Sequence, residues 1–108
     1  MAISKAQDLV SSNGVVVFSK TYCPYCTSVK KLFNDLGVTY KTIELDVESD
    51  GSEIQSALAE WTKQRTVPNV FIGGEHIGGC DSTFALRKSG KLVPMLTEAK
   101  ALSVSASS

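Results

Sequence analysis

Apolar residues in the first half of the chain change from helical to strand-like spacing and back. Positions 3–10 carry an apolar residue every three or four residues and predict a first helix. The run 15–18 is apolar without interruption, which is typical of a strand covered on both faces. The segment 24–36 returns to helical spacing and stops at Gly37, a residue favoured just after a helix. A strand over 40–45 completes a β–α–β unit and predicts two parallel strands.

A third helical pattern follows an acidic stretch. Ile54, Leu58 and Trp61 share one face of the predicted helix, and Ser52 is its expected N-cap. We interpret Trp61 as a core residue rather than a platform for a ligand, because an apolar residue at helical spacing is more often buried. The acidic segment 44–53 is interpreted as a solvated loop that enters the helix, and we assign it no metal.

Two short strands and two helices complete the predicted order. The strands 70–72 and 75–77 flank a pair of glycines, a strong signal for a two-residue hairpin. A helix capped by Asp81 or Ser82 follows, and a last helix is expected over 92–102. The whole order predicts an α/β fold in which a four-stranded mixed sheet carries helices on both faces.

Length and charge limit the classes of protein to consider. A chain of 108 residues has room for one domain with a core, so we take 1–108 as one domain with a flexible tail at about 103–108. Eleven basic and eleven acidic residues cancel, which gives no indication of nucleic acid or an anionic membrane as partner. No apolar run reaches the length of a membrane span. We expect a monomer.

Two cysteines separated by two residues stand where the second helix is predicted to begin, in the segment VVVFSKTYCPYC. A cysteine attacks as a thiolate, and the N-terminus of a helix stabilises that form. Cys23 is therefore the expected nucleophile, and Pro24 suits the first helical turn after it. Cys26 lies one turn further in, where burial favours the neutral thiol, so we expect it to act second. The pattern predicts a thiol–disulfide enzyme.

A zinc site or a structural disulfide would account for the cysteine pair less well. Zinc would need a second pair of ligands at short spacing, and only His76 and Cys80 remain to supply one. A purely structural disulfide is disfavoured in a reducing compartment, and three cysteines without a recognisable export signal fit such a compartment. We expect a cytoplasmic protein, or an organellar one if a transit segment has been removed.

Three motifs lie in one order along the chain: CPYC at 23–26, TVP at 66–68 and GGCD at 78–81. With the longer segments KTYCPYC, RTVPNVFIGG and HIGGCD, the chain closely resembles a dithiol glutaredoxin of the CPYC type (class I), common in plants and algae. The likeness extends over about 2–100. It implies a thioredoxin-like fold, glutathione as co-substrate, no tightly bound cofactor, no metal, and partner proteins that carry glutathione or a disulfide.

The resemblance also implies the residues that bind glutathione: Lys20, Tyr25, Gln55, Arg65, Thr66, Val67, Pro68, Gly79, Cys80 and Asp81. In that family the proline of TVP follows a cis peptide bond, so Val67–Pro68 would be cis and the Val67 backbone would pair with the cysteinyl part of glutathione. The sequence alone favours an ordinary trans proline at the start of a strand.

The remaining contacts implied by the family are charged or polar. The glycine carboxylate of glutathione would meet Lys20 and Gln55, with Arg65 as a helper. The γ-glutamyl carboxylate would rest on the N–H groups of Cys80 and Asp81, and the Asp81 side chain would pair with the ligand ammonium. Tyr25 would line the groove.

The implied reaction begins when Cys23 attacks the glutathione side of a mixed disulfide, after which a second glutathione reduces the enzyme. With protein disulfides, Cys26 would expel the substrate instead.

The rival function is a dimer that holds a [2Fe–2S] cluster through Cys23 and glutathione. Pro24 disfavours this function, because cluster holders in the family more often have Gly or Ser at that position. Thioredoxin is a weaker alternative, since its usual WCGPC is replaced by TYCPYC. Cys80 is interpreted as an inert thiol or a groove residue, rather than a site of oxidation and dimerisation.

Overall fold

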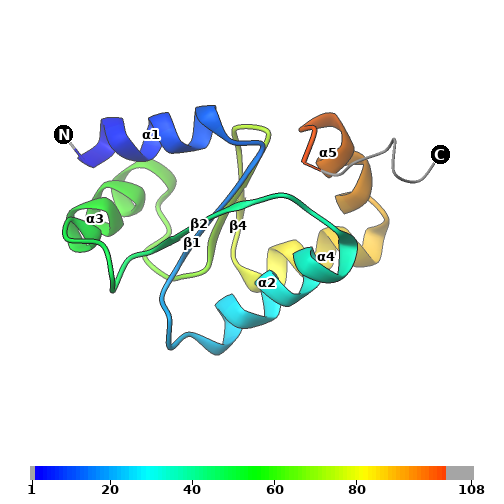
Figure 1. Ribbon diagram of the computed structural model, residues 1–108, viewed down its shortest axis with the longest axis horizontal. Coiled ribbons are helices and arrows are strands. Elements are labelled where there is room, and N and C mark those ends of the chain that lie inside the picture. Colours follow the sequence, from blue (N-terminus) through cyan, green and yellow to red (C-terminus); the bar gives the residue numbers. More distant parts are fainter. Residues whose placement is uncertain (1, 102–108) are drawn as a thin grey trace.

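The computed structural model describes residues 2–101 (Figure 1). In chain order the elements are α1 (Ala2–Ser12), β1 (Val15–Ser19), α2 (Pro24–Leu36), β2 (Lys41–Glu44), α3 (Gly51–Thr62), β3 (Asn69–Ile72), β4 (Glu75–Gly78), α4 (Cys80–Ser89) and α5 (Leu92–Glu98). This order is the one that the spacing of apolar residues predicts.

The four strands form one sheet in the order β2-β1-β3-β4. β1 pairs with β2 in parallel and with β3 antiparallel, so that Val17 lies beside Thr42 on one side and Val70 on the other. β3 and β4 form an antiparallel hairpin around Gly73 and Gly74, which both have positive φ. The sheet is therefore mixed, as the sequence predicts.

β1 is buried on both faces because it supplies side chains to two separate cores. Successive side chains of a strand point to opposite faces. Val15 and Val17 belong to a cluster with residues of α2, β3 and α5, whereas Val16 and Phe18 belong to a cluster with residues of α1 and α3. Figure 1 shows α1 and α3 on one side of the sheet and α2 and α4 on the other. The predicted helices on both faces are confirmed.

Three predicted helix ends are wrong, the starts of α3 and α4 and the end of α5. α3 begins at Gly51, so Ser52 lies inside the helix and is not its N-cap. Gly51 is buried so closely against the loop after β2 that a side-chain carbon would lie 1.7 Å from the carbonyl oxygen of Leu45. α4 begins at Cys80 with Gly79 at the N-cap position, so neither Asp81 nor Ser82 caps it.

The last helix ends earlier than predicted. α5 stops at Glu98, after which Lys100 adopts a left-handed conformation and Ala101 turns into the core. The N–H of Ala101 donates to the carbonyl of Leu96, and its own carbonyl accepts from the N–H of Thr39. This packing ends the helix. Position 102 and the tail predicted at 103–108 lie outside the described residues.

Trp61 is only partly a core residue. Its ring stacks on the buried ring of Phe71 with centroids 5.0 Å apart, yet 36% of the residue is exposed. The predicted core position is thus correct for one face of the ring and wrong for the rest.

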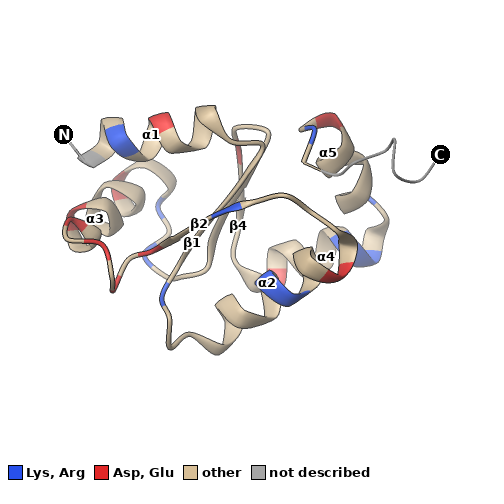
Figure 2. Ribbon diagram, viewed as in Figure 1, with Lys and Arg blue, Asp and Glu red and all other residues tan. Residues whose placement is uncertain are grey.

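Charged residues are distributed unevenly over this fold. Figure 2 shows acidic residues gathered around the start of α3, and Lys5 of α1 reaches Asp50 there at 2.9 Å.

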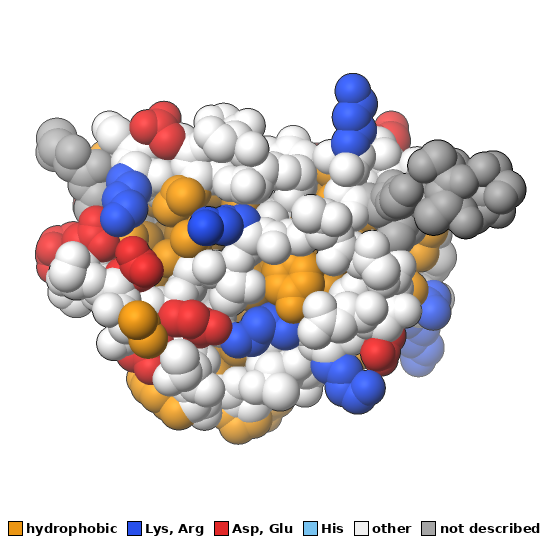
Figure 3. All heavy atoms as spheres, viewed as in Figure 1, with side chains coloured by type: hydrophobic (Ala, Val, Ile, Leu, Met, Phe, Trp, Pro, Cys, Tyr) orange, Lys and Arg blue, Asp and Glu red, His pale blue; other side chains and the backbone are white. Residues whose placement is uncertain are grey.

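Figure 3 shows hydrophobic side chains along the lower edge of the same view, where α2 begins. Two tyrosines of that region, Tyr22 and Tyr25, are 70% and 65% exposed. No helix within residues 2–101 is long and apolar enough to cross a membrane.

Candidate functional site

Cys23 occupies the N-cap position of α2. Its backbone is extended, and its Sγ accepts a hydrogen bond from the Cys26 N–H at 3.2 Å. Pro24 is the first residue of the helix, where its fixed φ fits and its missing N–H costs no hydrogen bond. The Cys23 residue is 8% exposed. A thiolate at this position faces a backbone donor and the positive end of the helix dipole, as the sequence predicts.

Cys26 lies one turn inside α2 and is fully buried. Burial, followed by the hydrogen bond with Cys23, raises the pKa of the Cys26 thiol to about 11. The buried Ser19 hydroxyl and the Lys20 backbone act in the opposite direction and do not offset this rise. Cys26 therefore keeps its proton at pH values at which a free cysteine begins to lose it.

The loop that precedes Cys23 is tied to the loop after β2. The Asp46 carboxylate accepts a hydrogen bond from the Thr21 N–H at 3.0 Å and another from the Thr21 hydroxyl. These bonds, with a smaller contribution from the charge of Lys20, lower the pKa of Asp46. The contact gives part of the acidic loop a fixed position, a role that its sequence does not reveal.

The segment that carries the TVP motif lies against the reactive sulfur. The Val67–Pro68 peptide bond is cis, as the resemblance implies. The Cys23 Sγ lies 3.7 Å from the Val67 carbonyl oxygen, to which the thiol donates. The side-chain amide nitrogen of Gln64 donates to the carbonyls of Thr66 and Pro68, at 3.0 and 2.9 Å. The loop therefore has a defined shape beside Cys23.

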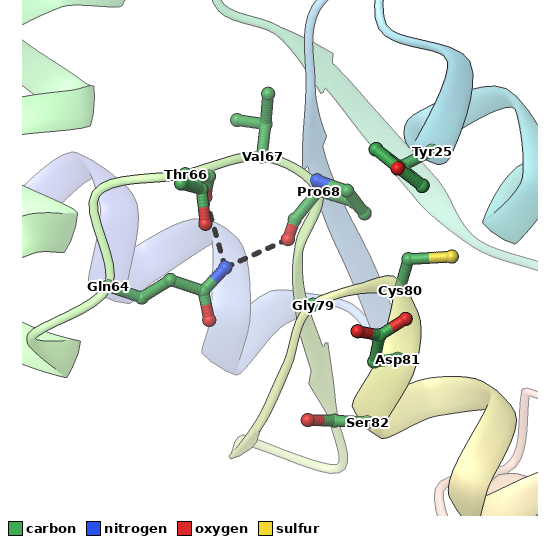
Figure 4. Close-up of a pocket in the computed structure, with 9 residues that line it drawn as sticks. All are labelled: Tyr25, Gln64, Thr66, Val67, Pro68, Gly79, Cys80, Asp81 and Ser82. Carbon is green, nitrogen blue, oxygen red and sulfur yellow. Dashed lines mark hydrogen bonds between the residues drawn. The ribbon is translucent and has the colours of Figure 1, made fainter.

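A groove of about 490 Å³ runs from this loop to the start of α4 (Figure 4). Its lining residues are Tyr25, Gln64, Thr66, Val67, Pro68, Gly79, Cys80, Asp81 and Ser82. Seven of these are among the residues implied by the resemblance, drawn from α2, the 64–68 loop and α4. Gln64 and Ser82 were missed as groove residues. The only signal in the sequence is their position next to the TVP and GGCD motifs.

Three residues assigned to glutathione do not line this groove. The Gln55 amide nitrogen donates to the backbone carbonyl of Arg65 at 2.9 Å. The Arg65 side chain lines a different pocket, together with Glu60 and Lys63. Lys20 precedes Cys23 in the chain and lies near Asp46, a residue that does not line the groove. Their contact with a ligand carboxylate stays a prediction.

Cys80 is the first residue of α4 and lies half-buried in the groove wall. Burial raises the pKa of its thiol, and the charges of Asp81 and Cys23 act in the same direction. All three cysteines are free thiols. This position agrees with the interpretation of Cys80 as a groove residue.

The zinc interpretation finds no support among the described residues. Within 2–101, no three His, Cys, Asp or Glu side chains are grouped so that they could hold a metal ion. The Nε2 atom of His76 lies 2.9 Å from Asn69 Oδ1. Because that amide oxygen only accepts hydrogen bonds, Nε2 carries a proton and is not free to bind a metal.

Comparison with known proteins gives the family. The glutaredoxin family model matches residues 15–77. The chain belongs to the glutaredoxin family. It is 74% identical to the glutaredoxin of Ricinus communis, over 94% of this chain and all of that protein. It is 69% identical to glutaredoxin-C2 of Arabidopsis thaliana, over 94% of this chain and 92% of that protein.

Solved structures that resemble this glutaredoxin are glutaredoxins as well. The crystal structure of the buckwheat glutaredoxin–glutathione complex has 68% sequence identity and a TM-score of 0.94, covering 95% of this chain and 94% of that one. The thioredoxin-like fold and the CPYC type of plant class I proteins are confirmed. The protein is an enzyme of the thiol–disulfide oxidoreductase class.

Proposed function

We propose that this glutaredoxin uses glutathione to reduce protein–glutathione mixed disulfides and protein disulfides through Cys23. The observation that carries the proposal is the position of Cys23 Sγ. It lies at the N-terminus of α2 and 3.7 Å from the Val67 carbonyl, which borders a groove leading to the start of α4. The buckwheat relative, described as a glutathione complex, supports glutathione as the ligand.

The groove offers the right groups for a tripeptide with two carboxylates. The Val67 backbone lies beside the Cys23 sulfur in the groove, where its N–H and carbonyl groups suit pairing with the cysteinyl residue of glutathione. The first N–H groups of α4 have no partner within the helix, and they favour an anion such as the γ-glutamyl carboxylate. The Asp81 carboxylate lies there as well and attracts the ligand ammonium.

The proposed reaction has two exchange steps. The Cys23 thiolate attacks the glutathione sulfur of the mixed disulfide, the sulfur–sulfur bond breaks, and the substrate leaves as a thiolate that takes up a proton. A glutathione thiolate then attacks the glutathione sulfur attached to Cys23. Cys23 leaves as a thiolate, and glutathione disulfide is released. In total the thiol of the second glutathione is oxidised and the substrate sulfur is reduced.

Cys26 takes part when the substrate is a protein disulfide. After Cys23 has formed a mixed disulfide with the substrate, Cys26 loses its proton and attacks the sulfur of Cys23, so the bond to the substrate breaks and the substrate leaves as a thiolate. Two glutathione molecules then reduce the resulting Cys23–Cys26 disulfide and leave as glutathione disulfide. The raised pKa of Cys26 keeps this thiol neutral before its attack on Cys23, so it does not compete as the first nucleophile. Cys26 is consequently dispensable for glutathionylated substrates.

The proposal is tested by the reduction of hydroxyethyl disulfide by glutathione, coupled to glutathione reductase. We expect activity in the wild type and in Cys26→Ser, and a loss of at least about a hundredfold in Cys23→Ser, because the nucleophile is removed. Circular dichroism checks that each variant is folded. Equal loss in both variants would refute the one-cysteine scheme, and an inactive, folded, reduced wild type would refute the proposed function.

A further inference from the structure

The amide group of Gln64 has only one possible orientation. Its nitrogen lies within hydrogen-bond distance of two backbone carbonyls, those of Thr66 and Pro68, on either side of Val67 (Figure 4). Carbonyl oxygens only accept hydrogen bonds, so the NH₂ end of the amide must face them. If the amide were rotated by 180°, three oxygens would be placed together.

The other end of the same amide is placed opposite to these two hydrogen bonds. Figure 4 shows Oε1 of Gln64 directed away from Thr66 and Pro68, and Gln64 and Ser82 are both lining residues of the groove. A side-chain carbon placed on Gly78 would lie 3.8 Å from this oxygen and 2.8 Å from the Ser82 hydroxyl, so both atoms border one space. No donor within residues 2–101 forms a hydrogen bond to Oε1, which leaves an acceptor for a ligand.

The Gln64 backbone is also fixed in place. Its N–H donates to the Thr62 hydroxyl at 3.1 Å, and that hydroxyl donates to the Leu58 carbonyl at 2.8 Å. The Asn69 amide approaches the same hydroxyl at 3.4 Å. Side chains that are held at both ends lose little freedom on binding, which makes the position of Oε1 well defined.

Asp81 provides a second acceptor at the same end of the groove. Its carboxylate, in the first turn of α4, lies beside Gly79 and Cys80 in Figure 4. The γ-glutamyl end of glutathione carries its ammonium and carboxylate on one carbon. If the carboxylate is bound by the N–H groups of α4, the ammonium on the same carbon enters the part of the groove that Asp81 and Gln64 line.

We propose that Gln64 is a specificity residue with two functions. Its NH₂ group holds the carbonyls on both sides of Val67, and its Oε1 accepts a hydrogen bond from the α-ammonium of the γ-glutamyl group. This inference rests on the proposed function, since it assigns a ligand contact within the same groove. It extends that function by naming the chemical group on the substrate that Gln64 recognises.

The test compares two glutathionylated forms of one peptide in the Cys26→Ser background. One carries glutathione, and the other carries the analogue in which the α-amino group of the γ-glutamyl residue is replaced by hydrogen. For Gln64→Met we expect kcat/KM to fall about tenfold or more with glutathione, as for a lost hydrogen bond to a charged group. With the deamino analogue the same substitution should cost only about two- to threefold, because only the loop function is lost.

Gln64→Lys is the second variant and keeps donors for the two carbonyls while removing the acceptor. It should fold even if Gln64→Met does not, and it should favour the deamino analogue over glutathione, because its ammonium repels the ligand ammonium. Gln7→Met is the matched control, since Gln7 is exposed on α1 away from the groove. It should leave both rates unchanged. Thermal unfolding verifies that every variant is folded.

The possible failures are distinct. Equal losses with both peptides would show that Gln64 only shapes the loop, and no loss in either variant would remove it from recognition altogether. Both results would overturn the inference while leaving the proposed function intact. The proposed function itself fails if the unsubstituted background enzyme reacts no faster with the glutathionylated peptide than with the same peptide carrying a mercaptoethanol disulfide.

Discussion

The two active-site cysteines differ in chemistry because they lie three residues apart at the start of one helix. Cys23 is at the N-cap position, where its sulfur accepts a backbone hydrogen bond and lies 3.7 Å from the carbonyl oxygen of Val67, a residue that lines the groove. Cys26 is one turn further on and is completely enclosed. The same element therefore supplies a nucleophile at its N-terminus, which is 8% exposed, and a fully buried second thiol that stays protonated.

Alkylation measures this difference directly. With a pKa of about 11, about one Cys26 thiol in a thousand is ionised at pH 8, and its burial hinders the reagent further. We expect iodoacetamide to modify Cys23 at least about tenfold faster than Cys26 in the folded, reduced protein. Mass spectrometry of peptides after timed quenching gives both rates. Denatured protein is the control, in which both cysteines should react alike. Faster modification of Cys26 in the folded protein would contradict the assigned order.

The sequence predicted the helices and strands better than their ends. The spacing of apolar residues depends on which face of an element is buried, and this information is local. The start of α3 depends instead on the contact between Gly51 and Leu45, and the end of α5 depends on the packing of Ala101. Such contacts leave no periodic signal in the sequence, so the cap predicted at Ser52 and the helix end predicted at 102 are wrong. At α4 the N-cap position is occupied by Gly79 rather than by Asp81 or Ser82.

The candidate site shows the same limit. The motifs located Cys23, the Val67–Pro68 loop and the start of α4, because each motif forms one short segment of the groove. Gln64 was missed because its role comes from the direction of its side-chain amide, which no motif specifies. The motif likewise does not show which partner the Gln55 amide has: in the structure its nitrogen donates to the Arg65 carbonyl.

A chain of polar contacts joins β4, β3 and the end of α3. His76 donates to Asn69, whose amide approaches the Thr62 hydroxyl, and that hydroxyl accepts from the N–H of Gln64. Partial burial lowers the pKa of His76 from its ordinary value of 6.5. His76 is the single histidine of the chain, so it is the side chain expected to dominate titration between about pH 5.5 and 7.5.

Stability should therefore fall on mild acidification. Because the folded-state pKa of His76 is below 6.5, the unfolded chain takes up the proton first, and the free energy of unfolding decreases as the pH falls through 6.5. The stabilisation is fully present above that value. Urea unfolding at pH 7.5 and 5.5 should show a smaller decrease in His76→Gln, which keeps a donor for Asn69 without titrating. Equal decreases in both proteins would exclude His76 as the cause.

Across the whole molecule, the sheet divides the core into two parts that support one site. One cluster lies under α2 and α5, and the other lies under α1 and α3. The groove is assembled where α2, the 64–68 loop and α4 meet, so its walls depend on both clusters (Figure 1). β1 is the only strand among the described residues that pairs with both a parallel and an antiparallel neighbour, and its alternating side chains enter both clusters.

If the sheet separates the two clusters energetically, substitutions on opposite faces should be additive. Ile54 belongs to the cluster with α1 and α3, and Ile72 belongs to the cluster with α2 and α5; both are at most 2% exposed. Ile54→Val and Ile72→Val should each lower the free energy of unfolding by about 0.5–1.5 kcal/mol. The double variant should lose the sum within about 0.5 kcal/mol, because the two side chains share no cluster.

The matched comparison is a pair of the same substitutions within one cluster. Ile43 and Ile54 both belong to the α1–α3 cluster, so Ile43→Val with Ile54→Val removes two methyl groups from one packed volume. Neighbours of this kind relax together, and their combined loss should depart from the sum by more than that of the pair on opposite faces. Urea unfolding at one pH gives all the values. Coupling across the sheet as large as coupling within the cluster would mean that β1 transmits strain between the two faces, and the groove would then respond to packing changes on either side.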